Sequence, residues 1–487
     1  MRGAWRVADV RAAERDLMAT LPPDTLMHRA AAGLARRCGL LLADRGGVYG
    51  ARVVLLVGSG DNGGDALYAG ALLARRGARV TALPLVPDRA HPGGVAALRA
   101  AGGITADALP SRADLVLDGI VGIGASGGLR EPAARLVAEL ATLTDRAGDR
   151  PPVVAVDVPS GVEVDTGDVP DGRDGQPAAV RADVTVTFGC LKPAHVVGPA
   201  AVRAGTVERV DIGLTPWLST PPAIRVPDDS DIRQWWPELP PSSEKYLRGV
   251  VGVATGSATY PGAGVLSVGG ALAGPTGLVR YAGGARAEVL HHHPSVIATD
   301  TVAAAGRVQS WVFGSGRGTD DAAAADLAEV LAAPVPVVLD ADGLTLLGDR
   351  PADRLRDRSA AVVLTPHDRE FARLAGGPPG ADRVAAAHDL AARTGAVVLL
   401  KGDRTVVATP DGTAYANPTG TSALATGGTG DVLAGLLGSL LAAGLPADRA
   451  AVAAAYLHGL AGRAAARHGP VTAPDVAAAL VDVVPVG

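Results

Sequence analysis

Hydrophobic residues recur with helical spacing directly after a glycine-rich run near the end of the chain. The apolar face of this predicted helix comprises Val432, Leu433, Leu436, Leu437, Leu440 and Leu441. The run before it, residues 426–431 (TGGTGD), therefore ends where a helix begins. Free amide groups at a helix start favour an anion such as phosphate, and a carboxylate such as Asp431 could take a proton from a nearby hydroxyl. The alternative is a structural turn with Asp431 as an ordinary helix cap.

The first half of the chain alternates buried strands with helical segments. Residues 9–43 are predicted to be helical. A strand over 52–57 then leads through a glycine-rich turn, 58–65, into a helix over 66–76 and a strand over 79–83. This βαβ unit indicates a parallel sheet, in which ligands bind outside the carboxyl ends of the strands.

The turn at 58–65 presents oxygen and amide groups on a glycine-rich backbone. It is not a phosphate-binding Walker A loop, because it lacks the Gly-Lys-Ser/Thr sequence. Its polar residues Asp61, Asn62 and Asp65 suit a polyol, a phosphate or a cation, and a purely structural turn remains the alternative.

Two more predicted strands end in polar residues at the same edge of the sheet. Residues 114–118 lead into a glycine-rich loop at 119–130, and residues 152–157 lead into the turn 158–161. Hard oxygen donors in this number suit a group I or II cation or a sugar. The polar residues gathered at this edge are Asn62, Asp118, Asp157 and Ser160.

The second half repeats the α/β pattern with a mostly parallel sheet. Strand-like runs cover 249–254, 311–313, 335–340, 361–365 and 396–401, and helical segments cover 319–332, 369–375 and 382–394. Polar residues again follow the strands, at Asp340, Asp342, His367 and Lys401. His367 is either a loop histidine or a substrate contact, and Lys401 is either an ordinary lysine or a phosphate ligand. His291, His292 and His293 alternate faces if extended, so we expect a solvated edge rather than a metal site.

Length and composition narrow the class of protein. The 487 residues suit two or three domains, and proline-rich stretches at 215–222 and 237–243 place the predicted boundary near residue 220, between domains 1–220 and 221–487. A net charge of −5 without a basic run predicts no nucleic-acid partner. Two isolated cysteines, Cys38 and Cys190, no signal peptide and no long apolar run predict a soluble cytoplasmic protein without a membrane partner. We also expect a homo-oligomer.

Over residues 9–213 the chain resembles the NAD(P)HX epimerase family, which interconverts the R and S forms of hydrated NADH or NADPH at C6. The matching motifs are GSGDNGGDA at 58–66, the loop 118–130, DVPSG at 157–161 and TFGCLKP at 187–193. The resemblance implies a Rossmann-like αβα sandwich. Three departures are Asp61 in place of asparagine, Ala66 in place of glycine, and an extra Ala-Ser-Gly in the glycine loop.

The resemblance also implies roles for individual residues. A potassium ion would be held by Asn62, Asp118 and Ser160. Asp157 would bind substrate and act as the acid/base group, since epimerisation needs proton transfer or reversible ring opening at a carbon bearing oxygen. The other substrate-binding residues would be Asp61, Asn62, Gly63, Gly64, Asp65, Gly122, Ile123, Gly124, Ala125, Ser126, Gly127 and Gly128.

Residues 240–485 resemble the ADP-dependent NAD(P)HX dehydratases, a branch of the ribokinase-like fold. The motifs are EKYLRG at 244–249, TGS at 255–257, YPGA at 260–263, GSG at 314–316, DAD at 340–342, LTPH at 364–367 with Glu370, KG at 401–402 and ATGGTGD at 425–431. Leu424 stands where the family commonly has methionine. The implied substrate contacts are Ala263, Gly316, His367 and Asp431, and the implied adenine-nucleotide contacts are Lys401, Gly402, Asp403, Arg404, Thr405 and Gly430.

The second resemblance implies phosphoryl transfer from ADP to the C6 hydroxyl of the S hydrate, followed by loss of phosphate. Asp431 would deprotonate the hydroxyl, the amides of 427–430 would stabilise the transferred group, and magnesium would accompany ADP. The expected partners are therefore NADHX or NADPHX and ADP. Two alternatives stay open: a ribokinase-like sugar or vitamin kinase, and a first half that binds nucleotide or acts as a scaffold without catalysis.

Overall fold

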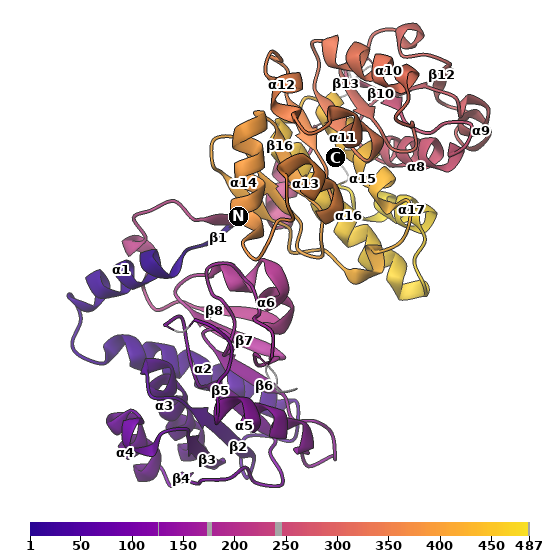
Figure 1. Cartoon of the computed structure of the whole chain (residues 1–487). Helices are drawn as coiled ribbons and strands as arrows, with labels where there is room; N and C mark the ends of the chain where they lie inside the picture. The colour runs from indigo at the N-terminus through magenta and orange to yellow at the C-terminus, as the bar shows by residue number, and fades with distance from the viewer. Residues whose placement is uncertain (125, 173–177, 239–245, 486–487) are drawn as a thin grey trace. The chain divides into compact units, whose positions relative to one another are not determined.

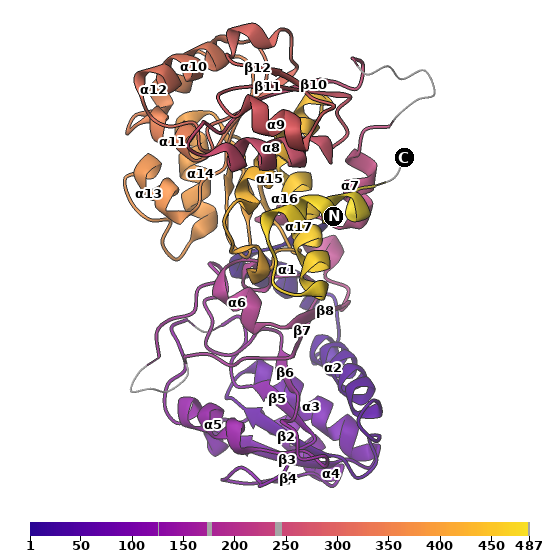
Figure 2. The same ribbon diagram turned by 90° about the vertical axis from the view of Figure 1, so that its right-hand side faces the viewer.

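The computed structural model describes residues 1–124, 126–172, 178–238 and 246–485. The chain divides into two compact units, Gly3–Ala223 and Ile224–Gly487, the latter together with Met1–Arg2. Each unit has its own sheet with helices packed against it (Figures 1 and 2). Within the described residues, no helix is both long and apolar enough to cross a membrane.

The sheet of the first unit is entirely parallel between neighbours, in the order β4-β3-β2-β5-β6-β7-β8. Its strands are β2 (Arg52–Val57), β3 (Arg79–Pro84), β4 (Ile104–Thr105), β5 (Leu115–Gly119), β6 (Val153–Val156), β7 (Val184–Phe188) and β8 (Thr206–Val210). The strand order reverses between β2 and β5. Ligands of open parallel sheets bind at such a reversal, beyond the carboxyl ends of the strands.

Helices bury both faces of this sheet, which explains its nearly continuous apolar strands. Val53, Leu55 and Val57 pack into one core, whereas Val54 and Leu56 pack into the other. The helices are α1 (Val7–Met18), α2 (Thr25–Ala43), α3 (Asp61–Arg75), α4 (Pro92–Ala100), α5 (Ala133–Glu139) and α6 (Gly198–Arg203).

The predicted bounds of two helical segments in the first unit, 9–43 and 66–76, are wrong. The segment 9–43 forms two helices, because Pro22 and Pro23 interrupt it after α1. Helix α3 begins at Asp61 rather than at residue 66, so Asp61, Asn62 and Asp65 lie on its first turns and not on a flexible loop.

The second unit contains a larger mixed sheet in the order β1-β9-β18-β17-β16-β15-β14-β13-β10-β11-β12. The strands from β16 to β12 in this order run parallel to their neighbours, and β17 pairs antiparallel with β16 and β18. The strands are β1 (Arg2–Ala4), β9 (Ile224–Val226), β10 (Val250–Ala254), β11 (Leu278–Ala282), β12 (Ile297–Thr299), β13 (Ser310–Phe313), β14 (Val337–Leu339), β15 (Val362–Leu364), β16 (Val397–Leu400), β17 (Val406–Ala408) and β18 (Ala414–Ala416).

Helices α8, α15, α16 and α17 pack with the sheet in one large core, and α10 to α14 lie on the opposite side in Figure 2. The helices are α7 (Asp229–Trp235), α8 (Pro261–Leu272), α9 (Arg286–His292), α10 (Asp321–Ala332), α11 (Asp342–Leu347), α12 (Pro351–Leu355), α13 (Asp368–Ala375), α14 (Arg383–Thr394), α15 (Thr429–Ala442), α16 (Ala447–Ala465) and α17 (Ala473–Val483). His291 and His292 end α9, so the extended conformation assumed for them is wrong.

Glycines let α8 and α15 approach backbone to backbone. A Cβ on Gly435 would lie 1.9 Å from the carbonyl oxygen of Ser267, and one on Gly270 would lie 2.1 Å from that of Val432. The buried leucines of α15 pack in the same core, and this packing fixes where α15 begins. The predicted apolar face of α15 is therefore confirmed.

Substituting Gly435→Ala should destabilise the second unit by about 1–3 kcal/mol or more, because the added methyl forces the two backbones apart. Gly262→Ala is the matched control on α8, where a Cβ meets no atom within 4 Å. Denaturant unfolding of both variants measures the difference. Equal stability of the two variants would contradict the close-packing account.

Candidate active sites

The first candidate site lies beyond the ends of β2 and β5, where two glycine-rich segments meet. A Cβ on Gly58 would lie 1.7 Å from the carbonyl oxygen of Ile120, so only glycine allows this approach. A Cβ on Gly122 would lie 3.0 Å from Oδ1 of Asn62, which places the second loop against the first turn of α3. Asn62 is buried, and its Nδ2 has no hydrogen-bond partner among the described residues.

Asp118 and Ser160 form one buried hydrogen-bonded group. The Ser160 hydroxyl donates to Asp118 Oδ1 at 2.6 Å, and the Ser160 amide donates to Asp118 Oδ2 at 2.8 Å. The amide of Val121 also donates to Ser160 Oγ at 3.0 Å. Burial raises the pKa of Asp118 to about 6, against the lowering effect of these hydrogen bonds. Among the described residues, Asp118 forms no ion pair with a basic side chain.

Asp157 follows β6 and is held by a buried lysine that the sequence interpretation did not single out. Lys192 Nζ donates to Asp157 Oδ1 at 2.5 Å, and the two side chains are 1% and 11% exposed. Oδ1 also accepts from the Thr187 hydroxyl at 2.9 Å and the Phe188 amide at 3.3 Å. The backbone at Asp157 has φ +66°, a strained conformation of the kind found at functional sites.

All three protons of the Lys192 ammonium have acceptors in the protein. They are Asp157 Oδ1, Thr187 Oγ1 at 2.9 Å and the carbonyl of Phe188 at 3.1 Å. Burial acts to raise the pKa of Asp157, but the Lys192 charge and hydrogen bond outweigh it, so this pKa lies below its usual value. Burial likewise acts to lower the pKa of Lys192, and Asp157 outweighs it, so that pKa is raised. The pair is therefore ionised at neutral pH.

His195 connects the backbone segments that carry this pair. Its Nδ1 accepts from the Lys192 amide at 3.0 Å, so its Nε2 carries the proton and donates to the Asp157 carbonyl at 2.8 Å. Burial lowers the pKa of His195 to about 4 and keeps the ring neutral. Neither His195 nor Lys192 stood out from the sequence. The only feature of the sequence that could have indicated them is the 187–193 motif, which contains Lys192 and ends two residues before His195.

The remaining predicted residues of the glycine loop do not all reach this cluster. Ile123 packs in the core, and a Cβ on Gly124 would lie 3.0 Å from the Arg11 guanidinium. The Gly127 amide donates to the Glu163 carboxylate, and Gly128 lies beside Ala178. Ser126 is exposed, and Ala125 lies outside the described residues. Among the described residues, neither Gly127 nor Gly128 contacts Asp118 or Asp157.

The second candidate site gathers the ends of four parallel strands and the start of α15. Lys401 Nζ, after β16, donates to Asp340 Oδ1 at 2.6 Å and lies 3.7 Å from Glu370 Oε2. The hydroxyls of Thr365 and Ser315 donate to Asp340 at 2.9 and 3.3 Å. Burial acts to lower the pKa of Lys401, but Asp340 and Glu370 outweigh it and raise that pKa.

Helix α15 opens onto this cluster. A Cβ on Gly430 would lie 3.6 Å from Lys401 Nζ and 3.7 Å from Asp340 Oδ2. Burial, and then the charge of Asp340, raise the pKa of Asp431 to about 6. The N-cap of α15 is Gly428 at φ +87°, with no side-chain cap, so Asp431 is not the cap and the first amides are left for an anion. His458 holds this start in place by donating from Nε2 to the Thr429 carbonyl at 2.9 Å.

Other predicted residues of the second site have local structural contacts. Nδ1 of His367 accepts from the amides of Arg369 and Glu370, so His367 caps α13. A Cβ on Gly316 would lie 2.9 Å from the Cβ of Ala263, which places these two residues side by side.

The loop 401–405 joins β16 to β17 and is held by several hydrogen bonds. The Arg383 guanidinium donates to the Lys401 carbonyl, the Thr405 hydroxyl to the Gly402 carbonyl, and the Arg404 guanidinium to the Pro418 carbonyl. Asp403 is exposed. Glu244 and Lys245 of the 244–249 motif lie outside the described residues.

Two protein-family models match separate parts of the chain, one within each of the two compact units. A model described as NAD(P)H-hydrate dehydratase matches residues 251–481, and one described as YjeF-related protein N-terminus matches 23–194. The bifunctional NAD(P)H-hydrate repair enzyme Nnr of Mycobacterium leprae is 50% identical over 483 residues, covering 99% of this chain and 98% of that protein. This chain belongs to the family of bifunctional NAD(P)H-hydrate repair enzymes.

A second bifunctional repair enzyme and a solved dehydratase structure are also similar. The Nnr enzyme of Mycobacterium tuberculosis strain H37Rv is 50% identical over 84% of this chain and 83% of its own length. An ADP/ATP-dependent NAD(P)H-hydrate dehydratase from Bacillus subtilis, co-crystallised with ATP and Mg²⁺, is 28% identical over 53% of this chain and 96% of its own, with a TM-score of 0.49. The predicted Rossmann-like and ribokinase-like α/β folds and the predicted epimerase–dehydratase fusion are confirmed.

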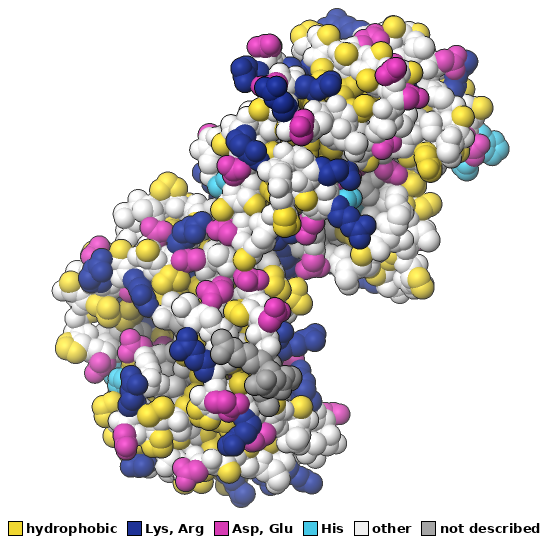
Figure 3. All heavy atoms as spheres, viewed as in Figure 1, with side chains coloured by type: hydrophobic (Ala, Val, Ile, Leu, Met, Phe, Trp, Pro, Cys, Tyr) yellow, Lys and Arg dark blue, Asp and Glu magenta, His cyan; other side chains and the backbone are white. Residues whose placement is uncertain are grey.

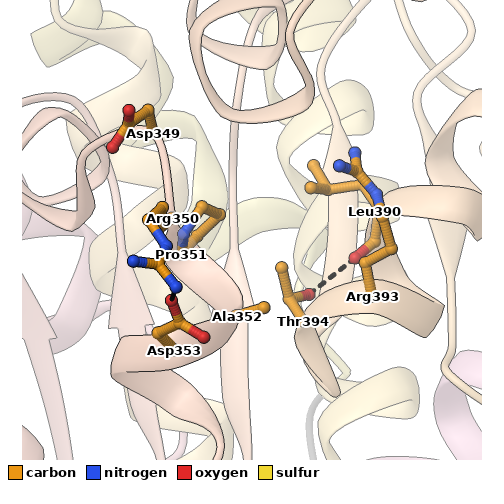
Figure 4. A pocket seen from close by; sticks show the side chains of 8 residues that line it. All are labelled: Asp349, Arg350, Pro351, Ala352, Asp353, Leu390, Arg393 and Thr394. Carbon is orange, nitrogen blue, oxygen red and sulfur yellow. Dashed lines mark hydrogen bonds and ion pairs between the residues drawn. The ribbon is translucent and has the colours of Figure 1, made fainter.

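One surface hollow of the repair enzyme lies apart from its candidate residues. A hollow of about 210 Å³ lies between α12 and α14 (Figure 4). Arg350 pairs with Asp353 on one side, and the Thr394 hydroxyl donates to the Leu390 carbonyl on the other. Its lining includes no residue of either strand-end cluster.

Lys192→Met should destabilise the first unit by about 3–5 kcal/mol at neutral pH, because it leaves the buried Asp157 carboxylate without its counter-charge. The double variant Lys192→Met with Asp157→Asn should recover part of this loss. Urea unfolding of the wild type, both single variants and the double variant measures the coupling. Additive effects of the two substitutions would show that the pair contributes no interaction energy.

Proposed function

We propose that this enzyme repairs hydrated NADH and NADPH at two separate sites. The first unit interconverts the R and S hydrates, and the second converts the S hydrate to NADH or NADPH with ADP, giving AMP and phosphate. We assign these activities to domains 1–220 and 221–487. The observation that carries the proposal is that one chain of this family contains two strand-end clusters, each with a buried aspartate paired with a lysine.

Asp157 is the proposed acid/base group of the first site. Three donors occupy Oδ1, so Oδ2, which has no hydrogen bond among the described residues, is the oxygen left for substrate. Lys192 keeps this carboxylate charged and oriented, and does not itself contact the substrate. The charges of Asp61 and Asp157 both act on Asp65, and Gly122 lies against Asn62. Asp61, Asp65 and the loop around Gly122 are proposed to bind the hydrated nicotinamide.

A potassium ion is proposed to bind Asn62, Asp118 and Ser160. These residues supply amide, carboxylate and hydroxyl oxygens, the hard donors that such cations prefer. A buried carboxylate without a basic partner, as at Asp118, also favours a bound cation. Once bound, the ion would supply positive charge next to the substrate oxygens.

In the second site, Asp431 is proposed to take the proton of the C6 hydroxyl as its oxygen attacks the β-phosphorus of ADP. AMP leaves, and the C6–O bond then breaks with its electrons on phosphate, a far better leaving group than hydroxide. Loss of a proton from C5 restores the double bond. The amides at the start of α15 and Lys401 would bind the transferred group, and magnesium would be held mainly by the phosphates of ADP.

The choice of nucleotide tests the proposal against the ribokinase-like kinase of a small alcohol that was considered from the sequence. Phosphorylation of a stable alcohol by ATP, with no NADH formed from NADHX and ADP, would refute the repair proposal. The homo-oligomeric state and cytoplasmic location stay predictions. Both cysteines are free and buried, in agreement with a reducing compartment.

Asp431→Asn should lower ADP-dependent dehydration of the S hydrate by about 100-fold or more, because it removes the base. In the wild-type enzyme this rate should rise with pH through about 6, since Asp431 must be ionised to accept the proton. NADH absorbance between about pH 5 and 8 measures both effects. A variant that keeps most of its rate would remove Asp431 from the mechanism.

Asp157→Asn should leave dehydration of the S hydrate unchanged but prevent full consumption of an epimer mixture. The S fraction is used at the wild-type rate, and the R fraction then reacts only at the spontaneous rate of epimerisation. Chromatography of the remaining hydrate measures this. Complete consumption at the wild-type rate would contradict the assignment.

A further inference from the structure

Helix α1 lies against the first candidate site, although the matching epimerase-domain model begins only at residue 23. Val7, Arg11 and Glu14 share one face of this helix, at spacings of four and three residues. The Val7 amide donates to Asp165 Oδ1 at 2.8 Å, and the Val7 side chain packs in the same cluster as Ile123. The Arg11 guanidinium lies 3.0 Å from where a Cβ on Gly124 would be. This face of α1 therefore meets the glycine loop.

Glu14 adds a carboxyl group to a site that already contains those of Asp61, Asp65 and Asp157. The charges of Lys192, Asp157 and Asp61 all act on it. Asp65 is buried in the same group. Lys192 is the buried cation of this group, and its three protons are used by Asp157, Thr187 and Phe188. Glu14 has no hydrogen bond or ion pair among the described residues.

The carboxyls of this group cannot all be charged, because one buried ammonium cannot balance them. Asp157 keeps its charge, since it accepts hydrogen bonds from the Lys192 ammonium, the Thr187 hydroxyl and the Phe188 amide. Burial raises the pKa of Glu14 to about 7, and burial also raises that of Asp65 well above its usual value. Glu14 is half-buried whereas Asp65 is buried, so Glu14 can regain a proton from water after each turnover.

We propose that Glu14 is the proton donor of the epimerase site, acting opposite the Asp157 carboxylate. The inference rests on the epimerase activity proposed above. Glu14 gives its proton to the C6 hydroxyl, the C6–O bond breaks, and water leaves while the N1 lone pair forms the C6–N1 double bond. A second water attacks C6 from the other face and gives one proton to Asp157, while the electron pair of the C6–N1 double bond returns to N1. Proton exchange with solvent then restores both carboxyls.

This role gives the two activities opposite pH dependence. Epimerisation requires protonated Glu14, so its rate should fall as pH rises through about 7. The groups that face Glu14 are Arg11 on its own helix, Asp61 and Asp65 of α3, Asp157 after β6, and Cys190 and Lys192 after β7. The cysteine thiol stays protonated, since burial raises its pKa to about 11.

The test compares the full-length wild-type protein with Glu14→Gln and with Asp16→Asn, an exposed carboxylate on the same helix. The rate of R-to-S conversion of NADHX is followed by chromatography between about pH 5.5 and 8.5, and the spontaneous rate is subtracted. Glu14→Gln should lose about 100-fold or more in rate and should lack the decline above pH 7. Asp16→Asn should match the wild type, and all three should dehydrate the S hydrate equally.

Two results would overturn the assignment of Glu14. One is a Glu14→Gln variant with at least half the wild-type rate, and the other is a wild-type rate that does not fall above about pH 7. If thermal unfolding shows that Glu14→Gln is not folded, a wild-type rate that does not fall above about pH 7 still overturns the assignment. A wild-type protein that does not epimerise NADHX at all would instead refute the epimerase activity on which the inference rests.

Discussion

A carboxylate buried at the end of a parallel strand must have either a counter-charge or a proton, and this constraint shapes both sites. Asp157 is paired with Lys192, and Asp340 with Lys401, in each case by a lysine that follows a different strand. Asp431 has no such close partner, and its pKa is correspondingly raised. Paired carboxylates keep their charge and orientation, whereas a carboxyl with a raised pKa can exchange protons near neutral pH. We propose that the two kinds of group together provide the acid–base chemistry of both sites.

The surrounding fold positions these groups through close backbone contacts. In the first unit, Gly58 allows the turn after β2 to touch Ile120. In the second, Gly270 and Gly435 allow α8 and α15 to meet, which places the uncapped start of α15 beside Lys401. The helix itself holds these amides, so they would need no reorganisation to bind the phosphate proposed for this site.

The sequence alone predicted the central strands that lead into the candidate site loops, because continuous apolar runs and glycine-rich turns are local signals. It did not predict β7, β8, β11, β12, β17 and β18. The helix bounds were less accurate, since the pattern over 9–43 hid the break at Pro22 and the start of α3 at Asp61. Lys192 and Glu14 could not be selected, because a single lysine or glutamate has no distinctive pattern. Their proposed roles rest on burial and on the charges of residues far away in the sequence. Roles of residues within the sites came from resemblance rather than from spacing.

The central claim is that one chain passes its substrate through both activities. The most direct measurement supplies purified R hydrate of NADH with ADP and magnesium, and follows NADH absorbance against a control without enzyme. The account predicts NADH formation well above the spontaneous rate, with consumption of one ADP for each NADH formed. Rapid conversion of the S hydrate, with none of the R hydrate above the spontaneous rate, would contradict it.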